Sequence, residues 1–357
     1  MDLNNLILFF VLVGFGLFFY QYFLPILKKN NPKLLIDDQF EKPQAFHESA
    51  ISTAGGTGIF ISLLILNFYF FFFKNIFFLE YLSFCTLFFL LGFVDDAKIK
   101  VKPLIRLTLM IAFLIILVKY NDIYLKYTGI EVLNNWLANS KIFSLIFICL
   151  CFLFVINGTN LIDGYNGLLG FHSLIIFINL FAVNYLSDNK DLANLLFFVI
   201  LILLIFLKFN FPKAKIFLGD SGSYLLGAFI ALSVIQTSIA NPTISPFYFC
   251  ILLFYLFFEV FFSFFRKLIK EKKSPIHPDD RHLHMLFYKI LVKKNNNNLK
   301  SNYYVSVFIN LIYLGMITPA ILMMKNGLFC KYYSIVFFVT YLVLYKVASK
   351  KVDQKVV

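Results

Sequence analysis

Charged residues are scarce in this chain. Asp, Glu, Lys and Arg together make up 14% of its 357 residues, whereas 60% of the residues are hydrophobic. A domain that folds in water needs a more polar surface, so this composition excludes a soluble globular protein and indicates that the solvent is a lipid bilayer. The apolar runs also lack strict alternation of apolar and polar residues. This excludes a membrane barrel and leaves helices as the spanning elements.

Cysteine is sparse as well, with five residues that lie in or beside apolar runs. Cys149 and Cys151 are two positions apart, so they do not share a face of a helix. Neither a disulfide framework nor a cysteine zinc site is indicated.

We also find no internal repeat of the kind that builds transporters from inverted halves, and we expect one domain over residues 1–357.

Eleven apolar runs are each about as long as a helix must be to cross a hydrocarbon core of roughly 30 Å. We predict an all-α polytopic integral membrane protein with about 11 transmembrane helices. No basic residue precedes the first run and no obvious small-residue cleavage site follows it, so we expect it to remain as an anchor. The predicted spans are residues 5–27, 51–73, 76–94, 103–119, 142–156, 168–186, 192–207, 216–238, 245–265, 303–324 and 331–348.

Basic residues are distributed unevenly between the two sides of these spans. Of the 32 Lys and Arg residues, 25 fall on one side and 7 on the other. Basic loops are retained in the cytoplasm, so we assign the basic side to the cytoplasm and expect a multi-pass protein of the inner (plasma) membrane. The cytoplasmic loops that carry the polar clusters are then 28–50, 95–102, 157–167, 208–220 and 266–302.

The net charge of +13 is spread over these loops. The retention of basic loops in the cytoplasm largely accounts for it, so nucleic acid is not an expected partner. Attraction to membrane lipid headgroups and to a polyanionic substrate is the more economical functional interpretation.

Two adjacent carboxylates, Asp95 and Asp96, close the third predicted span. Carboxylates are unfavourable at the membrane boundary, and neighbouring lysines at a solvated helix end would explain them without a function. Other polar clusters on the same side favour a functional role. We therefore expect a catalytic cleft at the cytoplasmic face.

The connection over 157–167 carries three amides and a carboxylate among glycines that let a ligand approach the backbone closely. Side-chain oxygens of Asn and Asp suit Mg²⁺, although a turn-rich connection would use the same residue types. The four side chains are Asn157, Asn160, Asp163 and Asn166.

The segment from Phe217 to Asp220 opens the next cytoplasmic-side helix. An Asp at a helix start can cap the helix, and capping is compatible with metal binding. Glycines on both sides of Asp220 leave room for a phosphate near the helix N-terminus.

Three of the five histidines lie within 277–284, beside Arg281. No Cys accompanies them and their spacing matches no common zinc site. The Arg281 guanidinium suits phosphate oxygens, and the imidazoles of His282 and His284 can donate to the same anion. A solvated basic loop is the alternative.

Together, these clusters offer carboxylates for a divalent cation, amides and glycines for close contact, and cations for negative oxygens. This inventory is typical of phosphoryl transfer, in which a protein positions two anions and neutralises their charge. The place of the clusters at a membrane face indicates one lipid substrate and one soluble substrate.

Four ordered motifs resemble those of the polyprenyl-phosphate N-acetylhexosamine-1-phosphate transferase family (glycosyltransferase family 4), which includes undecaprenyl-phosphate GlcNAc-1-phosphate transferases. The resemblance covers essentially the whole chain. The motifs are the Asp95-Asp96 pair, Asn-x-x-Asn-x-x-Asp-Gly-x-x-Gly-Leu over 157–168, Phe-x-Gly-Asp-x-Gly over 217–222 and Pro-Asp-Asp-Arg-His-Leu-His over 278–284.

The resemblance implies transfer of an N-acetylhexosamine 1-phosphate from a UDP-sugar to undecaprenyl phosphate, with release of UMP and with Mg²⁺ or Mn²⁺ as cofactor. Such a reaction initiates O-antigen (lipopolysaccharide) or another cell-surface polysaccharide. A homodimer is compatible with it, and both a single displacement and a covalent intermediate stay open.

The resemblance also implies roles for individual residues. Asp220 would be the main metal ligand with Asn160 as a second, and Asp95 or Asp96 would assist the attacking lipid phosphate. Asp163 would belong to the same catalytic centre. The substrate-binding residues would be Asn157, Asn160, Asn166, Phe217 against the uracil, and Arg281, His282 and His284 at the diphosphate or sugar.

Two departures from the family pattern bear on substrate contacts. Asn166 stands where many relatives have a second Asp, and the 42–56 loop lacks the Pro-x-Pro-Arg stretch expected before its glycines. The alternatives are a phospho-N-acetylmuramoyl-pentapeptide transferase of peptidoglycan synthesis, a catalytically inactive scaffold and a transporter. A transporter would place its charges near the membrane centre, whereas these lie at one face.

Overall fold

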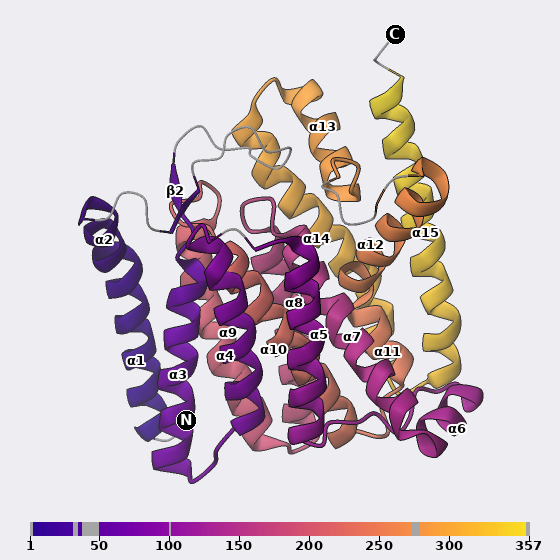
Figure 1. Ribbon diagram of the computed structural model, residues 1–357, viewed down its shortest axis with the longest axis horizontal. Coiled ribbons are helices and arrows are strands. Elements are labelled where there is room, and N and C mark those ends of the chain that lie inside the picture. The colour runs from indigo at the N-terminus through magenta and orange to yellow at the C-terminus, as the bar shows by residue number, and fades with distance from the viewer. Residues whose placement is uncertain are drawn as a thin grey trace.

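The computed structural model describes residues 3–30, 35–37, 50–99, 101–272, 274 and 279–354. Helices run side by side as a bundle, and short strands and loops gather at one end of it (Figure 1). The described N-terminal helix begins at the opposite end and the last helix finishes at the loop-rich end. The fold is therefore all-α, as the composition predicts.

The spanning helices follow the apolar runs closely. They are α1 (Leu3–Phe18), continued by a π-helical segment (Phe19–Phe23) and α2 (Leu24–Asn30), α3 (Gly55–Lys74), α4 (Leu79–Asp96), α5 (Pro103–Tyr120), α7 (Lys141–Ile162), α8 (Leu168–Leu186), α9 (Lys190–Asn210), α10 (Gly219–Ala240), α11 (Pro246–Leu252) with α12 (Phe254–Phe265) and a second π-helical segment (Arg266–Glu271), α14 (Asn298–Leu322) and α15 (Gly327–Asp353).

Within the described part of the chain, nine helices are long and apolar enough to cross a membrane. A tenth span is the pair of α11 and the helix Phe254–Glu271, which meet at 71°. Helix α4 corresponds to the third predicted span, the one predicted span that this count leaves out, and its 18 residues include the carboxylates of Glu80, Asp95 and Asp96. The prediction of an all-α polytopic membrane protein is confirmed.

Several segments predicted as loops are helical. Helix α7 continues to Ile162, so Asn157 and Asn160 lie on its last turns and not in a connection. The predicted loop 266–302 contains the π-helical segment, helix α13 (Leu283–Asn295) and the start of α14. Hydropathy misses these parts because polar residues do not prevent a helix from satisfying its own backbone hydrogen bonds outside the membrane core.

Helix α10 is the most buried of the spans and lies at the centre of the bundle. It packs most extensively against α4 and α7. Contact with α4 requires Gly92, because a Cβ there would lie 2.3 Å from the carbonyl oxygen of Asp220. This close approach brings the end of α4 against the first turn of α10.

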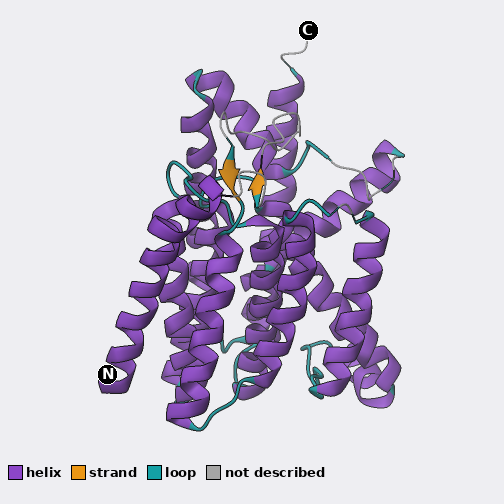
Figure 2. Cartoon of the chain, turned by 60° about the vertical axis from the view of Figure 1, so that its left-hand side comes forward, coloured by secondary structure: helices purple, strands orange, loops and turns teal. Residues whose placement is uncertain are grey.

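Every polar cluster predicted from the sequence, within the described residues, lies toward the loop-rich end. Figure 2 shows the two strands β1 (Ile36–Asp37) and β2 (Ile51–Ser52) near this end. They pair antiparallel, and Ser52 also bridges to Ile216 just before α10. Residues 38–49, which include most of the divergent 42–56 loop, lie outside the described residues.

Candidate active site

A cavity of about 1120 Å³ opens at the loop-rich end of the bundle. Its lining comes from the ends of α4, α7 and α10, from the start of α5, and from the 279–282 segment. Of the residues predicted to form the site, the structure brings these to its wall: Asp95, Asp96, Asn157, Asn160, Asp163, Asn166, Phe217, Asp220 and His282. Four motifs that are far apart in the sequence thus meet in one place.

Asp96 holds the start of α10. Its carboxylate accepts hydrogen bonds of 2.9 Å from the backbone N–H groups of both Asp220 and Ser221. These are the orphan donors of the first turn, and no side chain of the residue at the N-cap position satisfies them. The cap of α10 is therefore supplied by α4, which leaves the Asp220 carboxylate for other contacts.

Gly219 makes this arrangement possible. Its φ of +79° is a left-handed conformation that L side chains rarely adopt. A Cβ there would lie 2.5 Å from the carbonyl oxygen of Thr53 and 2.6 Å from Oδ2 of Asp96. Any side chain at this position would displace the Asp96 carboxylate from the cap.

Asp220 reaches across to α7. Its Oδ1 accepts a 2.8 Å hydrogen bond from Nδ2 of Asn160, and the same nitrogen donates to Oγ of Ser223 at 3.0 Å. Both Nδ2 hydrogens of Asn160 are thus used, and its Oδ1 is the atom available to a cation. The two predicted metal ligands are therefore neighbours.

A guanidinium completes the acidic end of the cavity. Arg106 forms an ion pair with Asp95, and its NH1 lies 3.7 Å from Oδ2 of Asp220. The same group lies over the ring of Tyr224 at 5.8 Å from its centroid. The guanidinium thereby offsets part of the negative charge of these two carboxylates.

From the sequence, Arg106 is one of the 25 basic residues that orient the protein, and no role in the site was predicted for it. A signal was present, because Arg106 lies inside the apolar run that begins at Pro103. An ionisable residue within a membrane span is a functional candidate by default.

Asp163 follows the last residue of α7 and lines the same cavity. Burial raises the pKa of its carboxyl well above the usual range, and the nearby carboxylates of Asp220 and Asp96 raise it further. Asn157, two turns earlier, donates from Nδ2 to the carbonyl oxygen of Leu153 at 2.8 Å. The end of α7 thus presents both an amide and a carboxyl group to the cavity.

Asn166 is engaged in holding the turn after α7. Its Nδ2 donates to the carbonyl oxygen of Pro212 at 2.9 Å, and its backbone N–H donates to Oδ1 of Asn302 at 2.8 Å. These bonds connect the turn to the segment before α10 and to α14. Phe217, from that same segment, is half-buried and lines the cavity.

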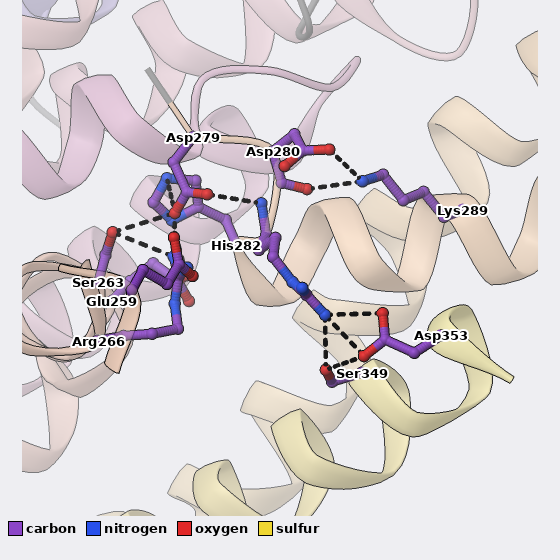
Figure 3. A network of polar contacts seen from close by, with 11 residues as sticks. Glu259, Ser263, Arg266, Asp279, Asp280, His282, Lys289, Ser349 and Asp353 are labelled. Carbon is purple, nitrogen blue, oxygen red and sulfur yellow. Dashed lines mark hydrogen bonds and ion pairs between the residues drawn. The ribbon is translucent and has the colours of Figure 1, made fainter. Parts of the chain in front are cut away.

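His282 lines the same cavity from the segment just before α13. Its Nδ1 lies 3.0 Å from Oε1 of Glu259, a side chain of α12 that is 1% exposed. Arg266 pairs with Asp279 beside it (Figure 3). No role was predicted for Glu259 from the sequence, although a carboxylate inside the 245–265 apolar run was the available signal.

The structure does not bring Arg281 or His284 to the cavity. Arg281 donates to the Asp353 carboxylate at 2.7 Å and to Oγ of Ser349 at 3.1 Å, both on α15. His284 is fully buried, with its Nδ1 3.1 Å from the hydroxyl of Tyr255. Alternate residues at the start of a helix point in different directions, which sequence proximity does not reveal. His277 and Pro278 lie outside the described residues.

Within the described residues, no group of three or more His, Cys, Asp or Glu side chains is arranged to hold a metal ion. The pair of Asp220 and Asn160 offers oxygen donors only, which suit Mg²⁺ when a substrate supplies further oxygens. The donor chemistry therefore fits a hard divalent cation shared with a phosphate group.

The fold and the cavity define a multi-pass membrane protein with an acidic site at one end of its bundle. Residues 78–238 match the family model of glycosyl transferase family 4. This range includes Asp95, Asn160 and Asp220 but not the 277–284 segment. The chain belongs to this family, that of the polyprenyl-phosphate hexosamine-1-phosphate transferases.

Curated relatives of two kinds are similar to the chain. A phospho-N-acetylmuramoyl-pentapeptide-transferase from Dictyoglomus turgidum is 33% identical over 285 residues, which cover 76% of this chain and 88% of the relative. An undecaprenyl-phosphate alpha-N-acetylglucosaminyl 1-phosphate transferase from Thermotoga maritima is 28% identical over 248 residues, 69% of this chain and 71% of the relative. A phospho-N-acetylmuramoyl-pentapeptide-transferase from Dictyoglomus thermophilum is 34% identical over 243 residues, which cover 65% of this chain and 74% of the relative. The family resemblance of the motifs is confirmed.

Proposed function

We propose that this protein transfers an N-acetylhexosamine 1-phosphate from a UDP-sugar to undecaprenyl phosphate at the cytoplasmic face of the inner membrane, releasing UMP. The observation that carries the proposal is the meeting of four carboxylates and Arg106 in one cavity at one end of a membrane bundle. In phosphoryl transfer, a protein acts mainly by positioning anions and neutralising charge. The reaction would begin a cell-surface polysaccharide such as O-antigen.

The walls of the cavity suit two different substrates. Apolar side chains of α5, α7 and α12 line it, among them Leu107, Leu153 and Phe261. Basic side chains line it as well, namely Lys98, Arg106, Lys213 and Lys267. A lining with both kinds of side chain suits a polyprenyl phosphate that enters from the membrane and a nucleotide sugar that enters from the cytoplasm.

Asp220 and Asn160 would hold Mg²⁺ or Mn²⁺, which would neutralise diphosphate charge when bound. Asp96 would keep the backbone of Asp220 in place, and Asp95 would keep Arg106 directed at the same point. Either carboxylate of this pair would assist the attacking lipid phosphate, in the same catalytic centre as Asp163.

The UDP-sugar would lie on the side of the cavity formed by the segment before α10. Phe217 would stack on the uracil, and Asn157 and Asn166 would contact the nucleotide or sugar through the amide atoms that their present hydrogen bonds leave available. His282 would meet a negative oxygen of the diphosphate or sugar. Arg281 and His284 would support this side from outside the cavity wall.

A second candidate is transfer of phospho-N-acetylmuramoyl-pentapeptide. The match to the Dictyoglomus turgidum relative over 88% of its length favours it. The motif at 279–284, which contains two histidines separated by Leu283, favours the N-acetylhexosamine reaction instead. The two reactions share the lipid acceptor and UMP, so only the donor separates them.

The test is to incubate membranes that contain the protein with undecaprenyl phosphate, Mg²⁺ and one of several donors: UDP-GlcNAc, UDP-GalNAc or UDP-N-acetylmuramoyl-pentapeptide. UMP and the lipid-linked product are measured together. We expect product from a UDP-N-acetylhexosamine, and we expect a chelator to abolish it and added Mg²⁺ to restore it. Product from the pentapeptide donor alone would establish the second candidate, and no product from any donor would refute both.

A further inference from the structure

We propose that Glu259 is a positioning residue that fixes the imidazole of His282 at the cavity wall. The inference rests on the proposed function, because it assigns Glu259 a part in the same reaction. Glu259 itself does not line the cavity, whereas His282 does. Its effect on the reaction would therefore pass through the histidine.

Glu259 is a carboxylate with donors on both oxygens. Oε1 accepts from the backbone N–H of Leu283 at 3.1 Å and lies 3.0 Å from Nδ1 of His282. Oε2 accepts from the hydroxyl of Tyr341 at 2.7 Å. Three elements, namely α12, the start of α13 and α15, thus meet on one side chain that is 1% exposed. A buried carboxylate with this many donors is held rigidly.

The same contacts select one tautomer of His282. The backbone N–H of Leu283 can only donate, so Oε1 must act as an acceptor. His282 then donates from Nδ1, and Nε2 is the atom that remains for a ligand. An orienting carboxylate on one ring nitrogen is a common device for presenting the other nitrogen to a substrate.

Nε2 of His282 forms no hydrogen bond with Asp279, the acidic side chain beside it. It lies 3.7 Å from Oδ2 of Asp279, which is longer than a hydrogen bond, and that same oxygen is bound by the Arg266 guanidinium. Figure 3 shows Glu259, Asp279 and His282 within one network of polar contacts. The ligand that suits Nε2 in this setting is a negative oxygen of the donor diphosphate or of the sugar phosphate.

The first experiment is a double-mutant cycle on the turnover of lipid-linked product. Glu259→Gln keeps an oxygen for Leu283 and His282 but removes the charge, which weakens the hydrogen bond to the ring. We expect the turnover to fall about 10- to 100-fold. His282→Ala should fall at least as far, and Glu259→Gln in the His282→Ala background should cause no further loss.

Glu271→Gln is the matched control. It makes the same chemical change at the end of the same helix, on a carboxylate that forms an ion pair with Arg266. We expect turnover within about twofold of the wild type. The thermal unfolding of each purified variant is measured in parallel, so that a loss of folded protein is separated from a loss of turnover.

Three outcomes would overturn the inference alone. They are normal turnover in Glu259→Gln, a loss in the double variant equal to the product of the two single losses, and an equal loss in Glu271→Gln. In each of these cases the wild type still makes product, so the proposed function stands. A wild type that makes no product with any donor would refute the proposed function and the inference together.

Discussion

The carboxylate of Asp96 accepts a 2.9 Å hydrogen bond from the backbone N–H of Asp220, although the two residues are 124 positions apart. The bond joins the last residue of α4 to the first turn of α10. Asp95, its neighbour, turns instead to Arg106 of α5. Adjacent aspartates that look equivalent in the sequence thus fix two different elements of one site.

Loss of this cap should destabilise the protein. We expect Asp96→Ala to lower the free energy of unfolding by about 1 kcal/mol, because two backbone donors of α10 lose their acceptor. Asp96→Asn, which keeps one oxygen, should lose less. Thermal unfolding in detergent measures both, with Asp188→Asn at an exposed turn as the control. Equal stability of Asp96→Ala and the wild type would contradict the cap.

Asp220 and Asp95 should be required for turnover but not for membrane insertion. We expect Asp220→Ala and Asp95→Asn each to abolish UMP release, because one removes the proposed metal ligand and the other releases Arg106. Asp188→Asn, far from the cavity, makes a matched control. Near-normal UMP release in either variant, with the protein shown to be inserted, would remove that residue from the mechanism.

We expect turnover to need both the positive charge of Arg106 and the planar geometry of its guanidinium. We expect Arg106→Leu to lower turnover about 100-fold or more, since it leaves the Asp95 and Asp220 carboxylates without their cation and removes a donor to phosphate oxygens. Arg106→Lys should recover part of this loss, because a lysine keeps the charge but not the planar geometry. A leucine variant with wild-type turnover would show that Arg106 is not part of the site.

Arg281 should act through α15. Because its guanidinium bonds Asp353 and Ser349, we expect Arg281→Ala and Asp353→Ala to lower turnover to the same, modest extent. The comparison uses initial rates of lipid-linked product at saturating donor. A large loss in Arg281→Ala alone would instead place Arg281 on the diphosphate, as the sequence motif implied.

His284 should make the folded protein sensitive to acid. Burial lowers its pKa to about 3, whereas an unfolded histidine has a pKa of about 6.5. The unfolded chain therefore binds an extra proton below about pH 6.5, so stability falls as the pH falls through this range. Between pH 7.5 and 5.5, the wild type should lose about 1 kcal/mol more than His284→Gln. Chemical denaturation at the two pH values measures the free energy of unfolding. Equal losses of stability in the two proteins would contradict the burial of a neutral ring.

The helical spans were predictable because hydropathy is a property of a whole segment. The short helix α6 (Glu131–Asn139) and α13 were not, since each lies in a mixed polar stretch. The site was predictable as a set of motifs. Two of its members were not, because Arg106 and Glu259 are single charges in apolar runs and acquire partners only when distant helices meet.

The directions in which side chains point were also not predictable from the sequence. Arg281, His282 and His284 are close in the sequence, yet one binds α15, one reaches the cavity and one lies in the protein interior. Their orientation depends on where α13 begins and on which residues of α12 and α15 face it. No pattern within 277–284 contains that information.

The confinement of the cavity to one end of the bundle has a consequence for the traffic of material through the protein. Its polar wall is built by helix ends, and the tightly packed α10 lies at the centre of the bundle behind it. The proposed transfer would therefore leave the sugar on the leaflet that the nucleotide sugar reaches. A head group made in this way would need a separate step to reach the opposite leaflet.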